Sequence, residues 1–212
     1  MADTTTATEY IDIDPKGDVI FVCNLTSGPQ STLILREYRI RASSAVLIAM
    51  SSVFGCMLGP HFKEGTQLRN NSTVEIALPD DEPKAIILLL NVLHLRSTAI
   101  PDELSSFQLV DVAKLADKYL CVEQVGLAAR MWFKALEDST NVYIQGNLLT
   151  ASFHLNFAEH FGKSSRALVM SSKQAYNLQS GLVMYGVDQG QGQDFANAFG
   201  EYATFRPREN FS

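Results

Sequence analysis

The residue types that most often bind metals are few in this chain and poorly spaced. None of its four histidines lies at helical i, i+4 spacing from another histidine or a cysteine. Zinc sites in proteins need clustered nitrogen and sulfur ligands of that kind. We therefore expect no metal site, and we interpret His94, which lies in an apolar segment, as a hydrogen-bonded core residue.

The three cysteines, Cys23, Cys56 and Cys121, are widely spaced and form no C-x-x-C pair. An odd number at such spacing is not typical of a disulfide framework or of a zinc site. Free cysteine is among the most buried residue types, and cytosolic thiols stay reduced. We predict that all three are buried, reduced thiols of an intracellular protein.

Two other patterns resemble parts of active sites. Gly162, Lys163 and Ser164 match the end of a phosphate-binding loop, but Phe157 stands where that loop needs its first glycine. We therefore expect Gly162 to end a helix. The acidic run at 80–82 consists of adjacent residues, which do not converge on one point, and it suits the capping of a helix that begins at Pro83. We expect no enzymatic activity and no cofactor.

Charge and hydropathy exclude further classes. The 212 residues include 17 Lys and Arg against 23 Asp and Glu, a formal net charge of −6. Such a chain has no basic surface for nucleic acid or anionic lipid. Its longest purely apolar run, residues 85–90, is far shorter than the roughly 20 residues that cross a bilayer. We expect a soluble intracellular protein, cytoplasmic and/or nuclear, without direct contact to nucleic acid or membrane.

The elements that would position any site begin with two β-rich segments. Residues 19–23 form a short apolar run, and residues 32–42 alternate, with Tyr38 and Ile40 on one side and arginines on the other. Alternation with period two is typical of a strand with one solvated face. Turn-forming residues between the segments favour a hairpin. Residues 73–78 predict one further strand.

Helical signals follow the hairpin. Residues 45–50 and 53–58 predict two short helices, each preceded by serines that can cap it. Residues 83–95 predict a helix that is apolar nearly all round, which indicates a central, buried position. Ser105 and Gln108 have the spacing of a capping box, and an amphipathic pattern follows them. This order of strands and helices predicts an α+β fold.

The C-terminal part continues as helices with weaker patterns. Residues 123–136, 142–161 and 164–176 predict three helices. From residue 187 the chain has few aliphatic residues, and residues 189–193 alternate glutamine and glycine, which is typical of a flexible segment. We therefore divide the chain into a flexible N-terminus at 1–16, a folded unit at 17–136, a helical extension at 137–186 and a flexible tail at 187–212.

Several blocks of the folded unit resemble the BTB/POZ domain, in order. Residues 17–22 are similar to the family's opening aspartate and first strand. Residues 40–47 are similar to its next strand and first helix, residues 50–54 to its S-x-V-F turn, and residues 57–64 to its M-L-x-x-x-F-x-E stretch. Residues 115–119, L-A-D-K-Y, are similar to the A-D-K-Y ending of its fourth helix.

The resemblance covers about residues 17–136 and is most similar to BTB proteins of filamentous fungi. It implies the BTB/POZ fold, a small three-stranded sheet flanked by about five helices, here with a C-terminal helical extension. It also implies a non-catalytic protein–protein interaction module that mediates homo- or hetero-oligomerisation as a scaffold or adaptor. Many relatives carry His and Lys where this chain has Ser43 and Ser44, and these form a charged pocket with the aspartate matched by Asp18. We expect that pocket to be absent here.

Members of the family commonly pair through the first helix and the start of the second. The resemblance therefore implies a homodimer, and we expect Val46, Leu47 and Leu58 to point into the core instead. In a two-fold dimer each patch would meet itself. The surface so implied consists of Ala45, Ile48, Ala49, Met50, Val53, Phe54 and Met57.

A second role stays open, as the substrate adaptor of a cullin-type ubiquitin ligase. Relatives that bind a cullin carry a hydrophobic-x-acidic motif, whose register falls here on Gln108 and Val110, and neither residue fits. We therefore rank the cullin below self-association. The possible partner surface that the resemblance implies consists of Phe62, Gln108, Asp111 and Tyr119.

Overall fold

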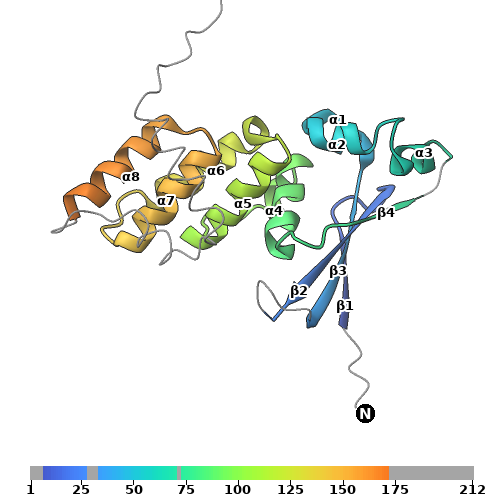
Figure 1. The fold of residues 1–212 in the computed structure, drawn as a ribbon, viewed down its shortest axis with the longest axis horizontal. Coiled ribbons are helices and arrows are strands. Elements are labelled where there is room, and N and C mark those ends of the chain that lie inside the picture. Colours follow the sequence, from blue (N-terminus) through green and yellow to red (C-terminus); the bar gives the residue numbers. More distant parts are fainter. Residues whose placement is uncertain (1–6, 28–32, 71–72, 172–212) are drawn as a thin grey trace, which may run out of the picture.

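The computed structural model describes residues 7–27, 33–70 and 73–171. These residues form a small mixed sheet at one end of the molecule and a layer of helices that extends to the other end (Figure 1). The predicted α+β fold is confirmed. The tail that we expected at 187–212 lies outside the described residues. Among the described helices, none is both long and apolar enough to cross a membrane.

The sheet has the strand order β1-β3-β2-β4. Strands β2 (Val19–Thr26) and β3 (Ile34–Ala42) pair antiparallel, which confirms the predicted hairpin, and β4 (Val74–Ala77) pairs parallel to β2. Phe21 lies beside Ile40 on one side and Ile76 on the other, and all three are buried. The alternating apolar side chains thus place one face of the sheet against the core.

Strand β1 (Ala7–Asp12) corrects the expected flexible N-terminus and makes the sheet four-stranded instead of three-stranded. It pairs parallel with β3 at the edge of the sheet. Within it only Ile11 packs against the core. Backbone pairing and surface ion pairs, including Arg36 Nη1 to Glu9 Oε2 at 2.7 Å, hold the strand. Such contacts leave little hydrophobic pattern in the sequence, which explains why the strand was missed.

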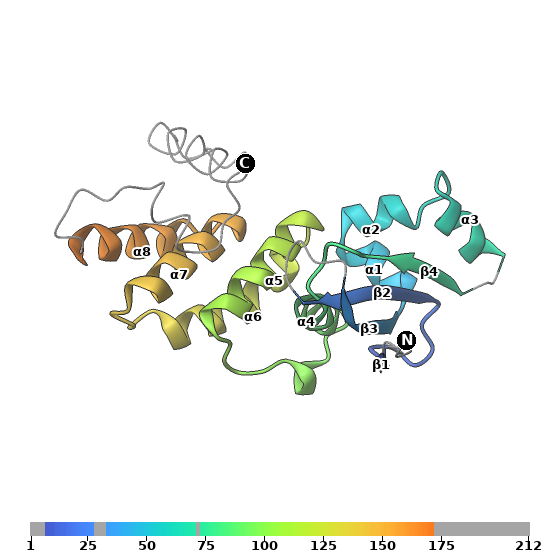
Figure 2. The ribbon, with the colours of Figure 1, turned by 60° about the horizontal axis from the view of Figure 1, so that its bottom comes forward.

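Three short helices follow the hairpin. Helices α1 (Ser44–Met50) and α2 (Ser52–Met57) agree with the predicted pair and lie at one side of the sheet (Figure 2). Helix α3 (Lys63–Arg69) was not predicted, and Gly65 is its only buried residue. A Cβ at Gly65 would lie 1.9 Å from the carbonyl oxygen of Gly59, so a residue without a side chain is required there.

Helix α4 (Pro83–Leu93) is buried along nearly its whole length, which confirms its central position. Glu82 is its N-cap, and a carboxylate oxygen of this residue accepts the Ala85 N–H at 2.6 Å. Within the acidic run at 80–82, Glu82 makes the capping bond, whereas Asp81 is buried and accepts hydrogen bonds from Lys118 and Tyr119. The acidic residues therefore have different structural roles.

Helices α5 (Ser106–Lys118) and α6 (Val122–Leu136) complete the predicted folded unit, with the short 3-10 helix η1 (Ser97–Ala99) before them. The capping box is present as predicted: the Ser105 side chain accepts the Gln108 N–H, and the Gln108 side chain accepts the Ser105 N–H. In Figure 1, α4 lies between the sheet and α5.

The helices of the extension have other bounds than we expected. Helix α7 (Val142–His154) is followed by a turn and by α8 (Ala158–Ser171), so Gly162 lies inside a helix and does not end one. The break occurs at Asn156, whose φ of 60° is left-handed. The N–H of Phe157 bonds to the Ser152 carbonyl at 2.9 Å, which is a helix-ending motif that usually contains glycine. An asparagine can take its place, because its side chain tolerates this conformation.

Candidate interaction surfaces

The first candidate surface lies on α1 and α2, where the family resemblance placed a dimer contact. Ala45, Ile48 and Ala49 are exposed, and 46% of Ile48 is accessible. Their neighbours on the two helices are half-buried and also pack against the core. We use the name α1–α2 surface for Ala45, Ile48, Ala49, Met50, Val53 and Met57.

Phe54 does not belong to this surface, which corrects its inclusion in the expected interface. Its side chain is fully buried, stacked on the Tyr119 ring at 4.4 Å between centroids and tilted against Phe21 at 5.4 Å. The first turn of α2 directs it inward, where its N–H is capped by Ser51 Oγ at 3.1 Å. A buried ring of this kind stabilises the fold and cannot contact a partner.

Two further expectations about these helices have different outcomes. Leu47 and Leu58 are buried in the core, as predicted. Val46 was expected beside them but is only half-buried. It therefore borders the α1–α2 surface, since the side chain retains contact with solvent.

Hydrogen bonds from two other elements fix the start of α1. Asp18 accepts the Ser44 N–H at 2.8 Å and the Ser44 hydroxyl at 2.7 Å. His94, at the end of α4, accepts the Ser43 N–H on Nε2 at 3.1 Å, so its Nδ1 carries the proton and donates to the Leu90 carbonyl at 2.9 Å. His94 is thus hydrogen-bonded as we predicted, and burial lowers its pKa. These bonds give the α1–α2 surface a rigid base.

The second set of expected partner residues is not brought together. Gln108 and Asp111 line a pocket of about 210 Å³ between α4 and α5. Phe62 is exposed in the turn before α3 and is not part of that pocket. Burial, with a smaller contribution from Glu82, raises the pKa of Asp111. The pocket therefore offers a half-buried carboxyl group beside an amide.

Tyr119 was expected on the partner surface, and the structure corrects this. Only 2% of the residue is exposed, and its hydroxyl donates a hydrogen bond to the buried Asp81. Lys118 also bonds to Asp81, at 2.6 Å, and the Tyr119 carbonyl accepts the Ser51 hydroxyl at 2.6 Å. Tyr119 thus holds the end of α5 against α2 and the start of α4, so its function in this fold is structural.

The sequence reasoning missed Phe107, which is 64% exposed on α5. It lies one helical turn before Asp111, and residues four apart share a helix face. The sequence does carry a signal that Phe107 is exposed, because this residue falls on the polar stripe of an amphipathic helix. An aromatic ring at that position has no core to pack against.

The described residues contain no group of three or more His, Cys, Asp or Glu side chains that could hold a metal ion. Cys23 and Cys121 are buried as predicted, and burial raises the pKa of both thiols to about 12. Cys56, on α2, is exposed, which corrects the expectation for the third thiol.

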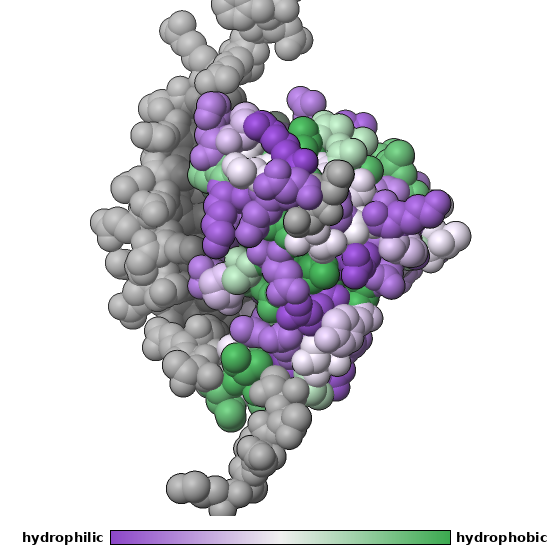
Figure 3. All heavy atoms as spheres, turned by 90° about the vertical axis from the view of Figure 1, so that its right-hand side faces the viewer, coloured by the Kyte–Doolittle hydropathy of each residue, from purple (hydrophilic) through white to green (hydrophobic). Residues whose placement is uncertain are grey.

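The end of the molecule opposite α8 is drawn in Figure 3. Hydrophobic side chains on this face form small groups separated by hydrophilic ones. A large continuous apolar patch, which often marks a protein contact, is not visible on that face.

The described residues thus combine a small mixed sheet, a buried central helix and exposed apolar side chains on α1 and α5. Residues 29–130 match the model of the BTB/POZ domain family. That part of the chain is therefore similar to the BTB/POZ domain, which is a protein–protein interaction module, and the match extends from before β3 into α6. No curated protein matches the chain.

Proposed function

We propose that the chain is a self-associating scaffold or adaptor whose BTB/POZ domain forms a homodimer through the α1–α2 surface. The observation that carries this proposal is Ile48, a branched aliphatic side chain 46% exposed on a helix whose start is held by hydrogen bonds. Ala45 and Ala49 lie three and one residues from it and are also exposed. Small side chains allow two helices to approach closely, so Ile48 can pack against the partner's helix.

The α1–α2 surface is too small to form a complete dimer interface. A stable interface buries about 800 Å² on each partner, and six side chains on two short helices supply only its apolar centre. The two methionines suit such a centre, because their flexible side chains fill irregular gaps. Exposed polar neighbours on α2, Ser52 and Cys56, would form part of the rim.

Light scattering at tens of micromolar protein tests the dimer. We expect a dimer for the wild-type chain and weaker association for Ile48→Asp, because a carboxylate would have to be buried in an apolar contact. Leu127→Asp is the matched control, since Leu127 is 84% exposed on α6, away from this surface. A monomeric wild-type chain, or equal association of both variants, would contradict the proposal. Ala49→Glu provides a second variant if Ile48→Asp changes the circular dichroism spectrum.

Cys56 gives an independent measurement on the native protein. It is the one exposed thiol among the three cysteines. If α1 and α2 meet a second copy, its alkylation rate should fall as protein concentration rises through the dimer transition. A rate independent of concentration, in a sample that scatters as a dimer, would place the contact elsewhere.

A second candidate function, the substrate adaptor of a cullin-type ligase, is favoured by one observation. Phe107 is 64% exposed and shares a face of α5 with Asp111, so a hydrophobic and an acidic side chain lie together, although not in the relatives' register. Stable 1:1 binding of a cullin N-terminal domain, lost in Phe107→Ala and retained in Phe62→Ala, would support this function. Absence of binding to the wild-type chain would exclude it.

A further inference from the structure

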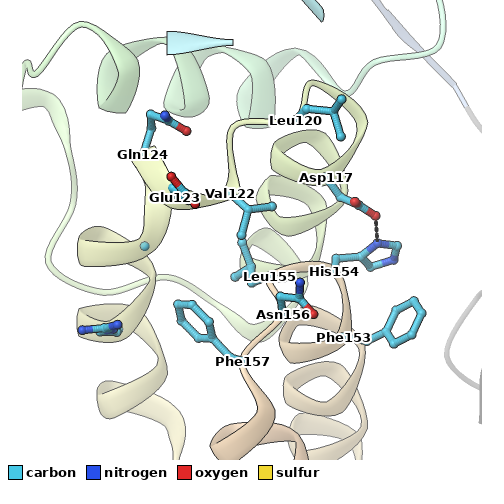
Figure 4. Close-up of a pocket in the computed structure, with 12 residues that line it drawn as sticks. Asp117, Leu120, Val122, Glu123, Gln124, Phe153, His154, Leu155, Asn156 and Phe157 are labelled. Carbon is cyan, nitrogen blue, oxygen red and sulfur yellow. Dashed lines mark hydrogen bonds and ion pairs between the residues drawn. The ribbon is translucent and has the colours of Figure 1, made fainter. Parts of the chain in front are cut away.

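A groove of about 940 Å³ runs between α6 on one side and the ends of α5 and α7 on the other (Figure 4). Val122 and the buried Leu155 lie near its middle, while Leu120 lies at one end and Phe157 at the other. The groove therefore lies between the BTB/POZ unit and the helical extension, and it offers both apolar and polar side chains.

The walls of the groove are fixed by packing and by one ion pair. His154 Nδ1, on α7, lies 2.8 Å from Asp117 Oδ2, on α5. Phe157 packs against the ring of Phe133 with centroids 5.6 Å apart. Glu123 and Arg130 on α6 carry opposite charges along the rim, so the rim favours neither an acidic nor a basic occupant. Six of the twelve lining residues are polar or charged, so an uncharged segment that combines apolar and polar side chains suits the groove best.

The chain itself supplies such a segment. Residues 172–212 lie outside the described residues, and they begin where α8 ends. No charged residue occurs between Lys173 and Asp188, and this stretch contains four consecutive apolar or aromatic residues flanked by glycines. They are Leu182, Val183, Met184 and Tyr185.

The connecting length allows this segment to return to the groove. Helix α8 begins directly after Phe157 and has 14 residues, so its far end is about 20 Å from the groove at ~1.5 Å per residue. The chain from Ser171 to Leu182 can span on the order of 35 Å at ~3.4 Å per residue. A tethered segment meets its site at an effective concentration on the order of 1 mM.

We propose that the segment Leu182, Val183, Met184 and Tyr185 binds in the groove of its own chain. Its side chains contact the exposed Leu120 and the half-buried Val122 and Phe157. A partner that uses this groove must displace the segment, so the C-terminal residues act as an internal competitor. The inference is independent of self-association through the α1–α2 surface.

The test uses the full chain and hydrogen exchange of the amides at 182–185. In the wild type these amides should exchange at least about tenfold more slowly than those of an unstructured peptide, because a bound segment is protected. Leu120→Asp, at the end of the groove, should abolish the protection. Leu95→Asp is the matched control, because Leu95 and Leu120 are both exposed leucines with positive φ, 55° and 49°, but Leu95 does not line the groove.

A second pair of variants introduces a large side chain instead of a charge. A Cβ at Gly126 meets nothing within 4 Å, and this residue lines the groove. Gly126→Tyr should therefore block the segment, whereas Gly162→Tyr on α8, where the space is also open, should leave the protection intact. Circular dichroism verifies that both variants are folded.

A labelled synthetic peptide of residues 174–187 completes the test. The wild-type groove is already filled, so the peptide should bind the full chain carrying Leu182→Asp and Met184→Asp about tenfold or more tightly than it binds the wild type. Addition of Gly126→Tyr to that double variant should abolish the binding. Amides at 182–185 that exchange freely in the wild type would overturn the proposal. So would protection that survives both groove variants, or protection that appears only as protein concentration rises, which would indicate a second copy as the occupant.

Discussion

The hydroxyl of Tyr119 donates a hydrogen bond to the carboxylate of Asp81, and both side chains are buried. Asp81 lies just before α4, and Tyr119 is the C-cap of α5. Burial and this bond raise the pKa of Tyr119, so the hydroxyl remains the donor at neutral pH. One tyrosine therefore connects the central helix to the end of the sequence block L-A-D-K-Y.

Removal of that hydroxyl should destabilise the domain. Tyr119→Phe keeps the ring stacked on Phe54 but leaves one oxygen of the buried Asp81 without its donor, which costs about 1–3 kcal/mol. Urea unfolding followed by circular dichroism measures the loss. Tyr10→Phe, at an exposed position on β1, is the control and should unfold like the wild type. Equal stability of the two variants would show that the bond contributes nothing.

His94 should make the stability of the domain depend on pH. Burial lowers its folded-state pKa below the ordinary value of about 6.5. The unfolded chain therefore takes up the proton first, and stability is complete above about pH 6.5 and falls as the pH decreases toward the folded-state pKa. Protonation also removes the Nε2 acceptor of the Ser43 N–H, a bond worth about 1 kcal/mol.

Unfolding free energies measured between pH 7 and pH 5 check the role of His94. His94→Gln should reduce the decrease in stability over this range, because it removes the titrating ring. His61→Gln, at an exposed position before α3, should follow the wild type. A wild-type decrease that is the same in both variants would have to arise from other groups.

Two glycines in helices should respond to alanine in opposite directions. At Gly65 the new Cβ would lie 1.9 Å from the Gly59 carbonyl oxygen, so Gly65→Ala must shift backbone and should cost about 1–3 kcal/mol. At Gly162 nothing lies within 4 Å, and Gly162→Ala should stabilise the domain by about 0.5–1 kcal/mol through helix propensity. Thermal unfolding of both variants measures the difference. A neutral Gly65→Ala would contradict the close approach of α3 to the preceding turn.

The three thiols should differ in reactivity. Burial raises the pKa of Cys23 and Cys121 to about 12, and only the thiolate reacts with alkylating reagents. We expect mass spectrometry after brief treatment of the native protein at neutral pH to show modification of Cys56 alone, and of all three cysteines in urea. Modification of Cys121 at the rate of Cys56 in the native protein would indicate local opening around α5 and α6.

The sequence by itself determined the elements with strong local signals. The hairpin of β2 and β3, the buried helix α4 and the capping box at Ser105 and Gln108 were all predicted, because hydrophobic periodicity and cap chemistry depend on neighbouring residues. The ordered blocks at 17–22, 40–64 and 115–119 also identified the domain family, which the match over 29–130 supports.

Only the tertiary structure decided which side of an element meets the core and which side stays exposed. The aromatic rings of Phe54 and Tyr119 could suit an interface. They are buried instead, because segments far apart in the sequence converge on them. Strand β1 and the break at Asn156 were missed for a related reason. Their stability comes from backbone hydrogen bonds to distant or neighbouring segments, and a backbone group carries no signature of its partner in the sequence.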